Sequence, residues 1–413
     1  MNESSLAGKR MLYLVGGPGN AERVDVSDLF ARRLAGMGFE VDYVIYGLEE
    51  TRAWEEIEWR GARAWVVGRS PVGGILGAII SKFYELFADF RTFWKALTGN
   101  YEIIQVRDKF VVGVLCALAA KLRGRLFTYW ISYPFAESRI VDGKEGNALV
   151  PFLSILGGHA AKFLLYKIIM PLADHVFVQS EQMKSDIAEQ GIDRDKMTPV
   201  PMAVAEELLD MPPQPIAADT ILYLGTLIRV RRLETLIEAL QIVREDRPGA
   251  TLMFVGDGDS PEDRIFLETR TVQLELESAV TFTGMLPMNE ALDHVARAAV
   301  CVSPFYPIPI LLSTSPTKIS EYMALGRPVV ANAHPEQSLI IEESGAGICV
   351  KWSAEDFAEA ILKLLNDPDS AEEMGSRGRD YVRTHRTYAV VAPAVADVYT
   401  DILDAHDEEL ALP

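Results

Sequence analysis

A lysine stands where a helix is expected to begin, inside the segment Ser313 to Pro328. Ser315 is a preferred N-cap residue, Pro316 suits the first helical position and Gly326 is a common stop, so the spacing predicts a helix between them. Free N–H groups at such an end attract phosphate, whereas the helix dipole disfavours a cation there. Lys318, in the first turn, therefore indicates an anion nearby.

Glu321 follows Lys318 by about one helical turn and can share a face with it. A lysine that binds phosphate beside a glutamate that binds ribose hydroxyls would suit a nucleotide. A well-capped helix with a Lys–Glu pair on its surface explains the same residues.

A second cationic cluster follows a predicted strand that closes on Gly225 and Thr226. It consists of Arg229, Arg231 and Arg232. Arginine can bind a pyrophosphate through two parallel hydrogen bonds, which suits a departing nucleoside diphosphate. The alternative is a solvated basic helix start, although cations are disfavoured there as well.

Further polar or glycine residues follow other predicted strands. In the second half of the chain they would let base and ribose approach the backbone, although glycine turns are common without a ligand: Gly256, Asp257, Gly258 and Gly284. In the first half, Gly17 and Gly19 belong to a glycine cluster that usually means a tight turn. The polar residues that follow later strands there are candidates for binding an acceptor: Arg107, Asp108, Ser132, Tyr133 and Glu137.

Strand and helix patterns alternate along the chain and restart once, which predicts an α/β protein with two doubly wound, Rossmann-like domains. We expect an N-terminal domain over 1–200, a proline-rich linker over 201–218 and a second domain over 219–386. A last helix within 387–413 could cross back to the first domain. Strand carboxyl ends are where open sheets bind ligands, so the two domains are expected to face each other across a cleft.

Charge and cysteine content limit the partners and the location that we expect for the protein. The 413 residues carry a formal net charge of -19, which argues against nucleic acid as a partner because such binding needs many cations. Cys116, Cys301 and Cys349 lie in apolar runs without metal-ligand or disulfide spacing, so we expect buried thiols, no metal site and a cytoplasmic location.

Two segments are more apolar over a longer stretch than a soluble enzyme needs, namely 70–97 and 150–173. The second contains lysine and histidine but no acid, a composition that suits a helix lying on an anionic membrane. This predicts a peripheral association with the inner face of the plasma membrane. Packing in the core or between domains is the alternative.

Five stretches in order give the chain a family resemblance. They are YLGTLIRVRRLETLIEAL (223–240), FVGDGD (254–259), VTFTGMLP (280–287), SPTKISEYMALGRPVVAN (315–332) and GAGICV (345–350). Together with DHVFVQSEQMKSDIAEQGI (174–192), they resemble glycosyltransferase family 4, whose members have the GT-B fold. The SPTK variant is similar to members that act in bacterial surface-polysaccharide assembly.

The resemblance implies roles for individual residues. Glu321 matches the second acid of the family's E-x7-E motif, which holds the donor ribose, while Ser313 replaces the first acid, which usually contacts the sugar. Thr317 and Lys318 would reach the diphosphate, with Ser315 beside them, and Thr226 replaces a usual arginine. Lys318, Arg231 and Arg232 would then carry catalysis by stabilising the leaving group.

The expected function is transfer of a hexose-type sugar with retention of configuration, because the resemblance implies it and no carboxylate pair at a recognisable spacing marks another route. The donor would be a UDP- or GDP-sugar and the acceptor a saccharide, expected to be lipid-linked, with no cofactor or required metal. Two alternatives remain open, namely a GT-B isomerase such as a nucleotide-sugar 2-epimerase and an inactive sugar-binding module.

Overall fold

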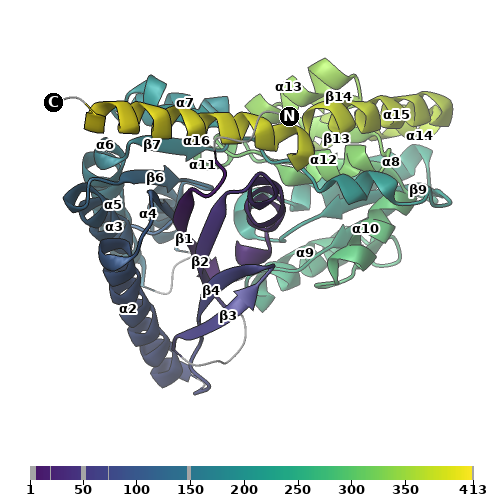
Figure 1. The fold of residues 1–413 in the computed structure, drawn as a ribbon. Helices are drawn as coiled ribbons and strands as arrows, with labels where there is room; N and C mark the ends of the chain where they lie inside the picture. Colours follow the sequence, from purple (N-terminus) through teal and green to yellow (C-terminus); the bar gives the residue numbers. More distant parts are fainter. Residues whose placement is uncertain (1–5, 19, 48–52, 73, 147–149, 412–413) are drawn as a thin grey trace. The chain divides into compact units, whose positions relative to one another are not determined.

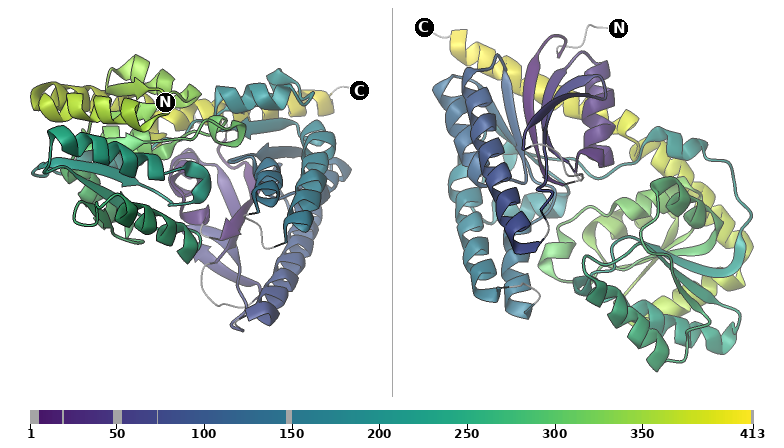
Figure 2. Two further views of the ribbon diagram at one scale, coloured as in Figure 1. Left: turned by 180° about the vertical axis from the view of Figure 1, so that it is seen from behind. Right: turned by 90° about the horizontal axis from the view of Figure 1, so that it is seen from below.

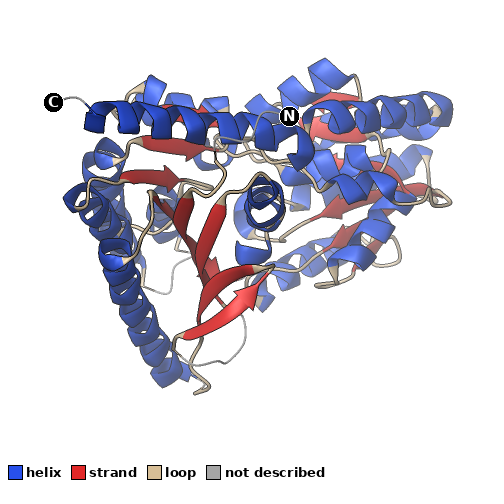
Figure 3. Ribbon diagram, viewed as in Figure 1, coloured by secondary structure: helices blue, strands red, loops and turns tan. Residues whose placement is uncertain are grey.

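A computed structural model of the protein describes residues 6–18, 20–47, 53–72, 74–146 and 150–411. The chain divides into two compact units (Figure 1). Unit 1 contains residues 1–201 and 388–413, and unit 2 contains residues 202–387. Each unit is an α/β domain built on a parallel sheet, as the alternating pattern predicts (Figure 3).

Unit 1 contains an eight-stranded sheet in the order β3-β4-β2-β1-β5-β6-β7-β8. Its strands are β1 (Arg10–Pro18), β2 (Glu40–Tyr46), β3 (Glu55–Trp59), β4 (Ala62–Val67), β5 (Ile103–Arg107), β6 (Leu126–Trp130), β7 (His175–Val178) and β8 (Met197–Pro199). All neighbours pair in parallel except β3, which is antiparallel to β4 at the edge. Three of the five residues of β3 are exposed glutamates, so sequence periodicity did not identify it as a strand.

Helices cover both faces of this sheet. They are η1 (Asn20–Glu22), α1 (Val24–Ser27), η2 (Leu29–Leu34), α2 (Gly74–Thr98), α3 (Val111–Leu122), α4 (Phe135–Glu145), α5 (Pro151–Leu164), η3 (Leu165–Ile169), α6 (Met170–Leu172), α7 (Glu181–Ala188), η4 (Arg194–Lys196) and α16 (Tyr388–Ala411). Between α1 and residue 35 the helical hydrogen bonding changes, because Leu29–Leu34 is π-helical. Ser180 caps α7, since its hydroxyl accepts a hydrogen bond from the Met183 N–H at 3.0 Å.

The final helix belongs to unit 1. Tyr399 on α16 donates a hydrogen bond to Gln105 on β5 and packs against Phe177 on β7, with the ring centroids 5.0 Å apart. The chain thus leaves unit 1 after β8 and returns to it at α16.

Unit 2 contains a six-stranded parallel sheet in the order β11-β10-β9-β12-β13-β14. Its strands are β9 (Ala217–Leu224), β10 (Thr251–Val255), β11 (Val280–Phe282), β12 (Ala298–Ser303), β13 (Val329–Asn332) and β14 (Gly347–Val350). Its helices are η5 (Glu206–Asp210), η6 (Arg229–Arg231), α8 (Glu234–Asp246), α9 (Pro261–Gln273), α10 (Met288–Arg297), α11 (Pro309–Leu312), α12 (Thr317–Ala324), α13 (Pro335–Ser344), α14 (Ala354–Asn366) and α15 (Pro368–His385), and Figure 2 shows them on both faces.

Two details of unit 2 differ from expectation. Cys349 is exposed on the edge strand β14, whereas Cys116 and Cys301 are buried as predicted. Within the segment expected as a linker, η5 forms a turn of helix and Leu209 is buried. Proline spacing identifies where a regular element must stop, but it does not reveal such short-range packing.

A buried ion pair fixes the end of unit 2. Arg386 follows α15, and its guanidinium lies 2.7 Å from the Glu336 carboxylate in the first turn of α13. Both side chains are only 7% exposed. Because a buried charge without its partner is strongly unfavourable, each residue depends on the other.

We therefore expect Arg386→Met to lower the free energy of unfolding by about 3–5 kcal/mol, since Glu336 would remain buried and unpaired. The double variant Arg386→Met/Glu336→Gln should recover part of that loss. Urea denaturation followed by circular dichroism measures both. Equal losses in the single and double variants would contradict the coupling.

Candidate active site

Three glycines meet at the carboxyl ends of neighbouring strands in unit 2. Gly225, Gly256 and Gly284 follow β9, β10 and β11, and their φ angles are 138°, 135° and 72°. A Cβ atom on Gly256 would lie 2.3 Å from the Gly225 carbonyl oxygen, and Gly256 also forms a β-bridge with Gly284. Gly256 and Gly284 are buried and Gly225 is half-buried, so the absence of side chains lets these strand ends pack closely. We call these three residues the glycine edge.

Lys318 lies beside this glycine edge. It is the second residue of α12, and its ammonium nitrogen donates a hydrogen bond to the Tyr223 hydroxyl at 3.0 Å. A Cβ atom on Gly225 would be 3.1 Å from that nitrogen. The side chain is 93% buried, since its relative exposure is 7%.

Arg231 reaches the same hydroxyl from the other side. One of its terminal nitrogens donates to the Tyr223 oxygen at 2.7 Å, and Tyr223 in turn donates to the Thr226 carbonyl at 3.0 Å. The Arg231 Nε atom is buried and has no hydrogen-bond partner among the described residues. Tyr223 therefore joins both predicted cations. The sequence analysis missed it, although its position two residues before Gly225 at a strand end could have indicated it.

The other two arginines of the cluster take different positions. Arg229 lies over the Phe266 ring at 4.1 Å and 3.9 Å from the Asp263 carboxylate. Arg232 is exposed and lies 3.9 Å from the Glu234 carboxylate. Of the three arginines, only Arg231 is directed to Lys318.

Electrostatics make this pair of cations unusual. Burial, and then the nearby charge of Arg231, lower the pKa of Lys318 well below its ordinary value, while Glu321 acts in the opposite direction. Neither Lys318 nor Arg231 forms a salt bridge with a carboxylate in the described part of the chain, although many other arginines do. Two adjacent cations without a paired acid form a site for an anion.

The loop before α12 is held by side chains from β13 and α13. Asn332 exchanges two hydrogen bonds with the backbone of Phe305, at 2.6 and 2.7 Å. His334 contacts the Leu311 carbonyl at 2.9 Å, and burial lowers its pKa to about 4, which keeps the ring neutral. Ser313, at the end of α11, is buried in this loop.

The predicted cap of α12 is wrong. The helix begins at Thr317, Pro316 occupies the cap position, and no side chain caps it. Ser315 instead accepts a hydrogen bond from the Met202 N–H at 2.9 Å, so the hydroxyl fixes a distant segment of unit 2. Such a long-range partner cannot be read from local spacing.

The turn after β10 is stabilised by two hydrogen bonds that Asp257 accepts. The Asp257 carbonyl accepts a hydrogen bond from the Leu227 N–H at 2.9 Å, and its carboxylate accepts one from the Gly258 N–H at 2.9 Å. A Cβ atom on Gly258 would lie 2.5 Å from the Asp263 Cβ atom, so this glycine serves the packing of α9.

In unit 1, Arg107 is fully buried and lies 2.7 Å from Asp25 and 3.3 Å from Asp108. It therefore has no exposed surface with which to contact an acceptor, contrary to expectation. Ser132 donates both its N–H, at 2.9 Å, and its hydroxyl to Asp108. Burial raises the pKa of Asp108 in spite of Arg107. Asp25 was not identified from the sequence, because it lies in a helix opposite the strand end.

Three other candidates of unit 1, Gly17, Tyr133 and Glu137, are half-buried. Tyr133 packs against Phe135 with ring centroids 5.0 Å apart. Glu137 accepts a hydrogen bond from the Tyr166 hydroxyl at 3.0 Å, which holds α4 against the following helix. Gly17 has a φ of 88° near the end of β1, while Gly19 lies outside the described residues.

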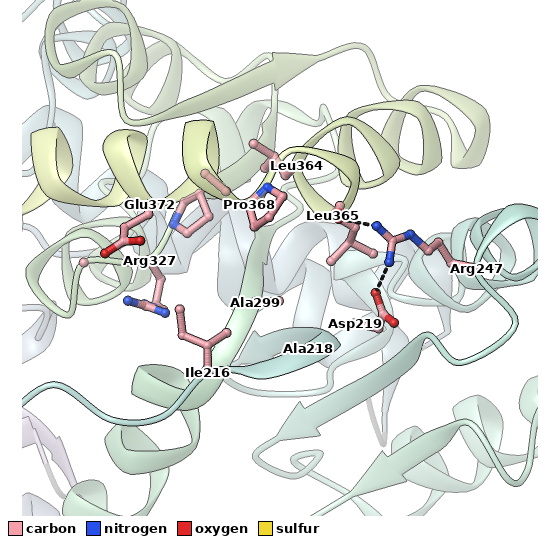
Figure 4. Close-up of a pocket in the computed structure, with 13 residues that line it drawn as sticks. Ile216, Ala218, Asp219, Arg247, Ala299, Arg327, Leu364, Leu365, Pro368 and Glu372 are labelled. Atoms are coloured by element: carbon pink, nitrogen blue, oxygen red, sulfur yellow. Dashed lines mark hydrogen bonds and ion pairs between the residues drawn. The ribbon is translucent and has the colours of Figure 1, made fainter.

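A separate cavity of about 360 Å³ opens at the other edge of the unit 2 sheet, where β9, β12 and β13 begin (Figure 4). Arg247 and Asp219 form an ion pair at 3.0 Å on its wall. No predicted site residue lines it. Among the described residues, no group of three or more His, Cys, Asp or Glu side chains could hold a metal ion.

Comparisons with known proteins place the chain among glycosyltransferases. The model described as "Glycosyl transferases group 1" matches residues 218–367, and "Glycosyl transferase 4-like domain" matches residues 26–203. The chain is 29% identical over 215 residues to a GDP-mannose-dependent alpha-(1-6)-phosphatidylinositol monomannoside mannosyltransferase of Mycobacterium tuberculosis, covering 50% of this chain and 53% of the relative. The chain thus spans about half the length of this curated relative.

Solved structures share the fold. Sucrose-phosphate synthase from Thermosynechococcus elongatus superposes with a TM-score of 0.71 at 20% identity, covering 96% of this chain and all of the other. Anabaena HepE in complex with UDP and glucose superposes with a TM-score of 0.70 at 15% identity, covering 94% and 99%. The predicted GT-B class of two Rossmann-like domains is therefore confirmed.

We expect Tyr223→Phe to weaken the binding of a nucleoside diphosphate about tenfold, since both cations lose a shared acceptor. Calorimetric titration with UDP and with GDP measures this. Tyr43→Phe is a matched control, because the Tyr43 hydroxyl is buried without a partner among the described residues. Equal affinities in both variants and the parent protein would contradict the role of Tyr223.

Diphosphate binding should also depend on pH. A bound anion favours charged Lys318, so affinity should fall as the pH rises through the lowered pKa of this lysine, and binding should take up protons near that pKa. Calorimetry in buffers of different ionisation enthalpy measures the uptake. Lys318→Gln should abolish it, and an unchanged proton uptake in that variant would refute the assignment.

Proposed function

The chain belongs to glycosyltransferase family 4, and from this premise we propose that it transfers a hexose-type sugar from a nucleoside-diphosphate sugar to a saccharide acceptor. The proposal rests mainly on Lys318 and Arg231, which share the Tyr223 hydroxyl and have no salt-bridge partner in the described ranges. A diphosphate supplies the missing negative charge. Its oxygens can accept hydrogen bonds from the N–H groups of the two side chains that do not bond to Tyr223.

The glycine edge supports the same donor. Because these glycines carry no side chains, a flat base and a ribose would come close to the strand ends at the half-buried Gly225. Glu321 lies one turn after Lys318 on α12 and is the residue proposed to bind the ribose hydroxyls. Ser313 stands where the family has an acid that contacts the sugar, so it is the position at which donor choice would differ.

The proposed reaction retains the anomeric configuration. The bond between the sugar C1 atom and the diphosphate oxygen breaks, and its electron pair stays on the diphosphate. A hydroxyl of the acceptor forms the new bond to C1 from the same face, and its proton passes to an oxygen of the departing phosphate. Lys318 and Arg231 stabilise the growing negative charge through positions fixed before the reaction. This route requires no protein nucleophile and no metal.

The donor and the acceptor are proposed by class. The relative from Mycobacterium tuberculosis is named for GDP-mannose and for a phosphatidylinositol mannoside, and the Anabaena structure holds UDP and glucose. These names support a UDP- or GDP-sugar and a lipid-linked saccharide. The buried, unpaired thiols of Cys116 and Cys301 support a cytoplasmic location.

We expect Lys318→Ala to lower kcat/KM for acceptor-dependent release of the nucleoside diphosphate by about 10²–10³-fold, because a donor to the leaving group is lost. Lys363→Ala is the matched control, since Lys363 is exposed in the last turn of α14 in the same unit. The readout is coupled detection of UDP or GDP in the presence and absence of an acceptor lipid extract.

Four results would contradict parts of the proposal. Unchanged turnover in Lys318→Ala would exclude the assigned role of this lysine. Conversion of the donor into another nucleotide sugar without net release of nucleoside diphosphate would favour an isomerase, and donor binding without any turnover would favour an inactive sugar-binding module. An inverted anomeric signal in the NMR spectrum of the product would exclude retention.

A further inference from the structure

Three helices of unit 1 expose an unusual number of large apolar side chains. Those on α2 are Leu76, Ile79, Phe83, Leu86, Phe87, Phe90 and Trp94; those on α3 are Val111, Leu118 and Leu122; and those on α5 are Phe152, Leu153, Leu156 and Phe163. On α2 they recur every three or four residues over almost the whole helix, which places them on one side of it. We call these residues together the apolar outer face.

The three helices share one side of the sheet. Ala88 of α2, Cys116 of α3 and Ile169 of η3, which continues α5, belong to one core cluster with Leu12 of β1 and Phe127 of β6. The opposite side of the sheet is covered by η2 and α16, where Phe30 and Tyr399 contact. Figure 1 shows α2, α3 and α5 along one side of these strands. Their exposed side chains consequently point away from the sheet in the same general direction.

The charge of this region is opposite to that of the whole protein. Across 74–98, 111–125 and 151–172 there are eight cationic residues, namely Lys82, Arg91, Lys95, Lys121, Arg123, Arg125, Lys162 and Lys167, and two acids, Glu85 and Asp89. Glu85 pairs with Lys82 at 3.1 Å and Lys109 at 3.3 Å. Burial raises the pKa of Asp89. In a chain of net charge -19, this face is locally cationic.

We propose that the apolar outer face binds the surface of a membrane that contains anionic lipids. Aromatic and aliphatic side chains enter the boundary between headgroups and acyl chains, and the surrounding cations attract the headgroups. The proposal deepens the proposed function and rests on it for the acceptor, because a lipid-linked saccharide is found only at such a surface. It also extends the segment 150–173 indicated by the sequence to α2 and α3.

The helix Pro151–Leu172 has the length and composition to span a bilayer, with a mean hydropathy of 1.3, yet its packing favours a helix that lies on the membrane. Leu165, Ile169 and Met170 are buried in the core of unit 1. A spanning helix would have to withdraw them from that core. Gly143 and Gly158 add to this constraint, because a Cβ atom on Gly158 would lie 2.9 Å from the Ala136 carbonyl of α4.

Charge also distinguishes a membrane from a second copy of the chain. A symmetric dimer through the apolar outer face would bring the cations of one copy against those of the other, because such an interface is isologous. Anionic headgroups instead neutralise them. The charge pattern therefore favours lipid over self-association.

The test is sedimentation of the full chain with vesicles of phosphatidylcholine alone and with added phosphatidylglycerol, at low and high salt. We expect binding that needs the anionic lipid and weakens with salt. Leu86→Glu/Phe90→Glu and Phe152→Glu/Leu156→Glu should each reduce the bound fraction about tenfold, since a carboxylate cannot enter the apolar layer. Lys121→Glu/Arg123→Glu should reduce it chiefly at low salt.

Ile265→Glu/Val272→Glu is the matched control, because both residues are exposed on α9 in unit 2 and should leave binding unchanged. Absence of vesicle binding, or equal binding by all variants, would overturn the proposal. Salt-resistant binding would indicate insertion of Pro151–Leu172, and a dimer that only the α2 variant dissociates would indicate self-association; either result overturns it. Affinity for UDP and GDP should be the same in every variant, which separates this test from that of the donor site.

Discussion

The proposed donor site depends on one constraint, which is that two cations are held beside each other without a carboxylate to neutralise them. Lys318 and Arg231 meet at the hydroxyl of Tyr223, a buried residue of β9. Folding alone gains little from this arrangement, because burial disfavours the charged lysine. The surrounding sheet must supply the rigidity that keeps them together, and the proposed diphosphate ligand would offset the electrostatic cost on binding.

The glycine edge and the two cations lie next to each other and would contact different parts of the proposed ligand. Gly225 must lack a side chain because Lys318, Arg231 and Tyr223 all lie within 3.3 Å of where its Cβ atom would be. The parallel strands bring Gly225, Gly256 and Gly284 to one edge, although nearly sixty residues separate the first from the last. Two cationic side chains thus lie next to strand ends that lack side chains, and the proposed nucleotide ligand has a matching division into diphosphate and flat base.

Much of the fold and part of the candidate site could be predicted from the sequence. The predictions that failed did so for physical reasons. The strand and helix alternation and the position of Lys318 follow from local periodicity and spacing, which is why they were accessible. Ser315, Arg107 and Tyr223 were misjudged or missed because their roles depend on partners far away in the chain, Met202, Asp25 and Lys318. The edge strand β3 was missed because its exposed glutamates conceal the alternation.

That edge strand has a consequence for how the protein behaves at high concentration. An edge strand presents unpaired N–H and C=O groups that can join the sheet of another molecule. β3 carries Glu55, Glu56 and Glu58 on its exposed surface, so a second β3 aligned beside it would bring like charges together. The edge thereby resists the growth of intermolecular β-sheet, which matters for a chain whose helices also expose apolar side chains to solvent.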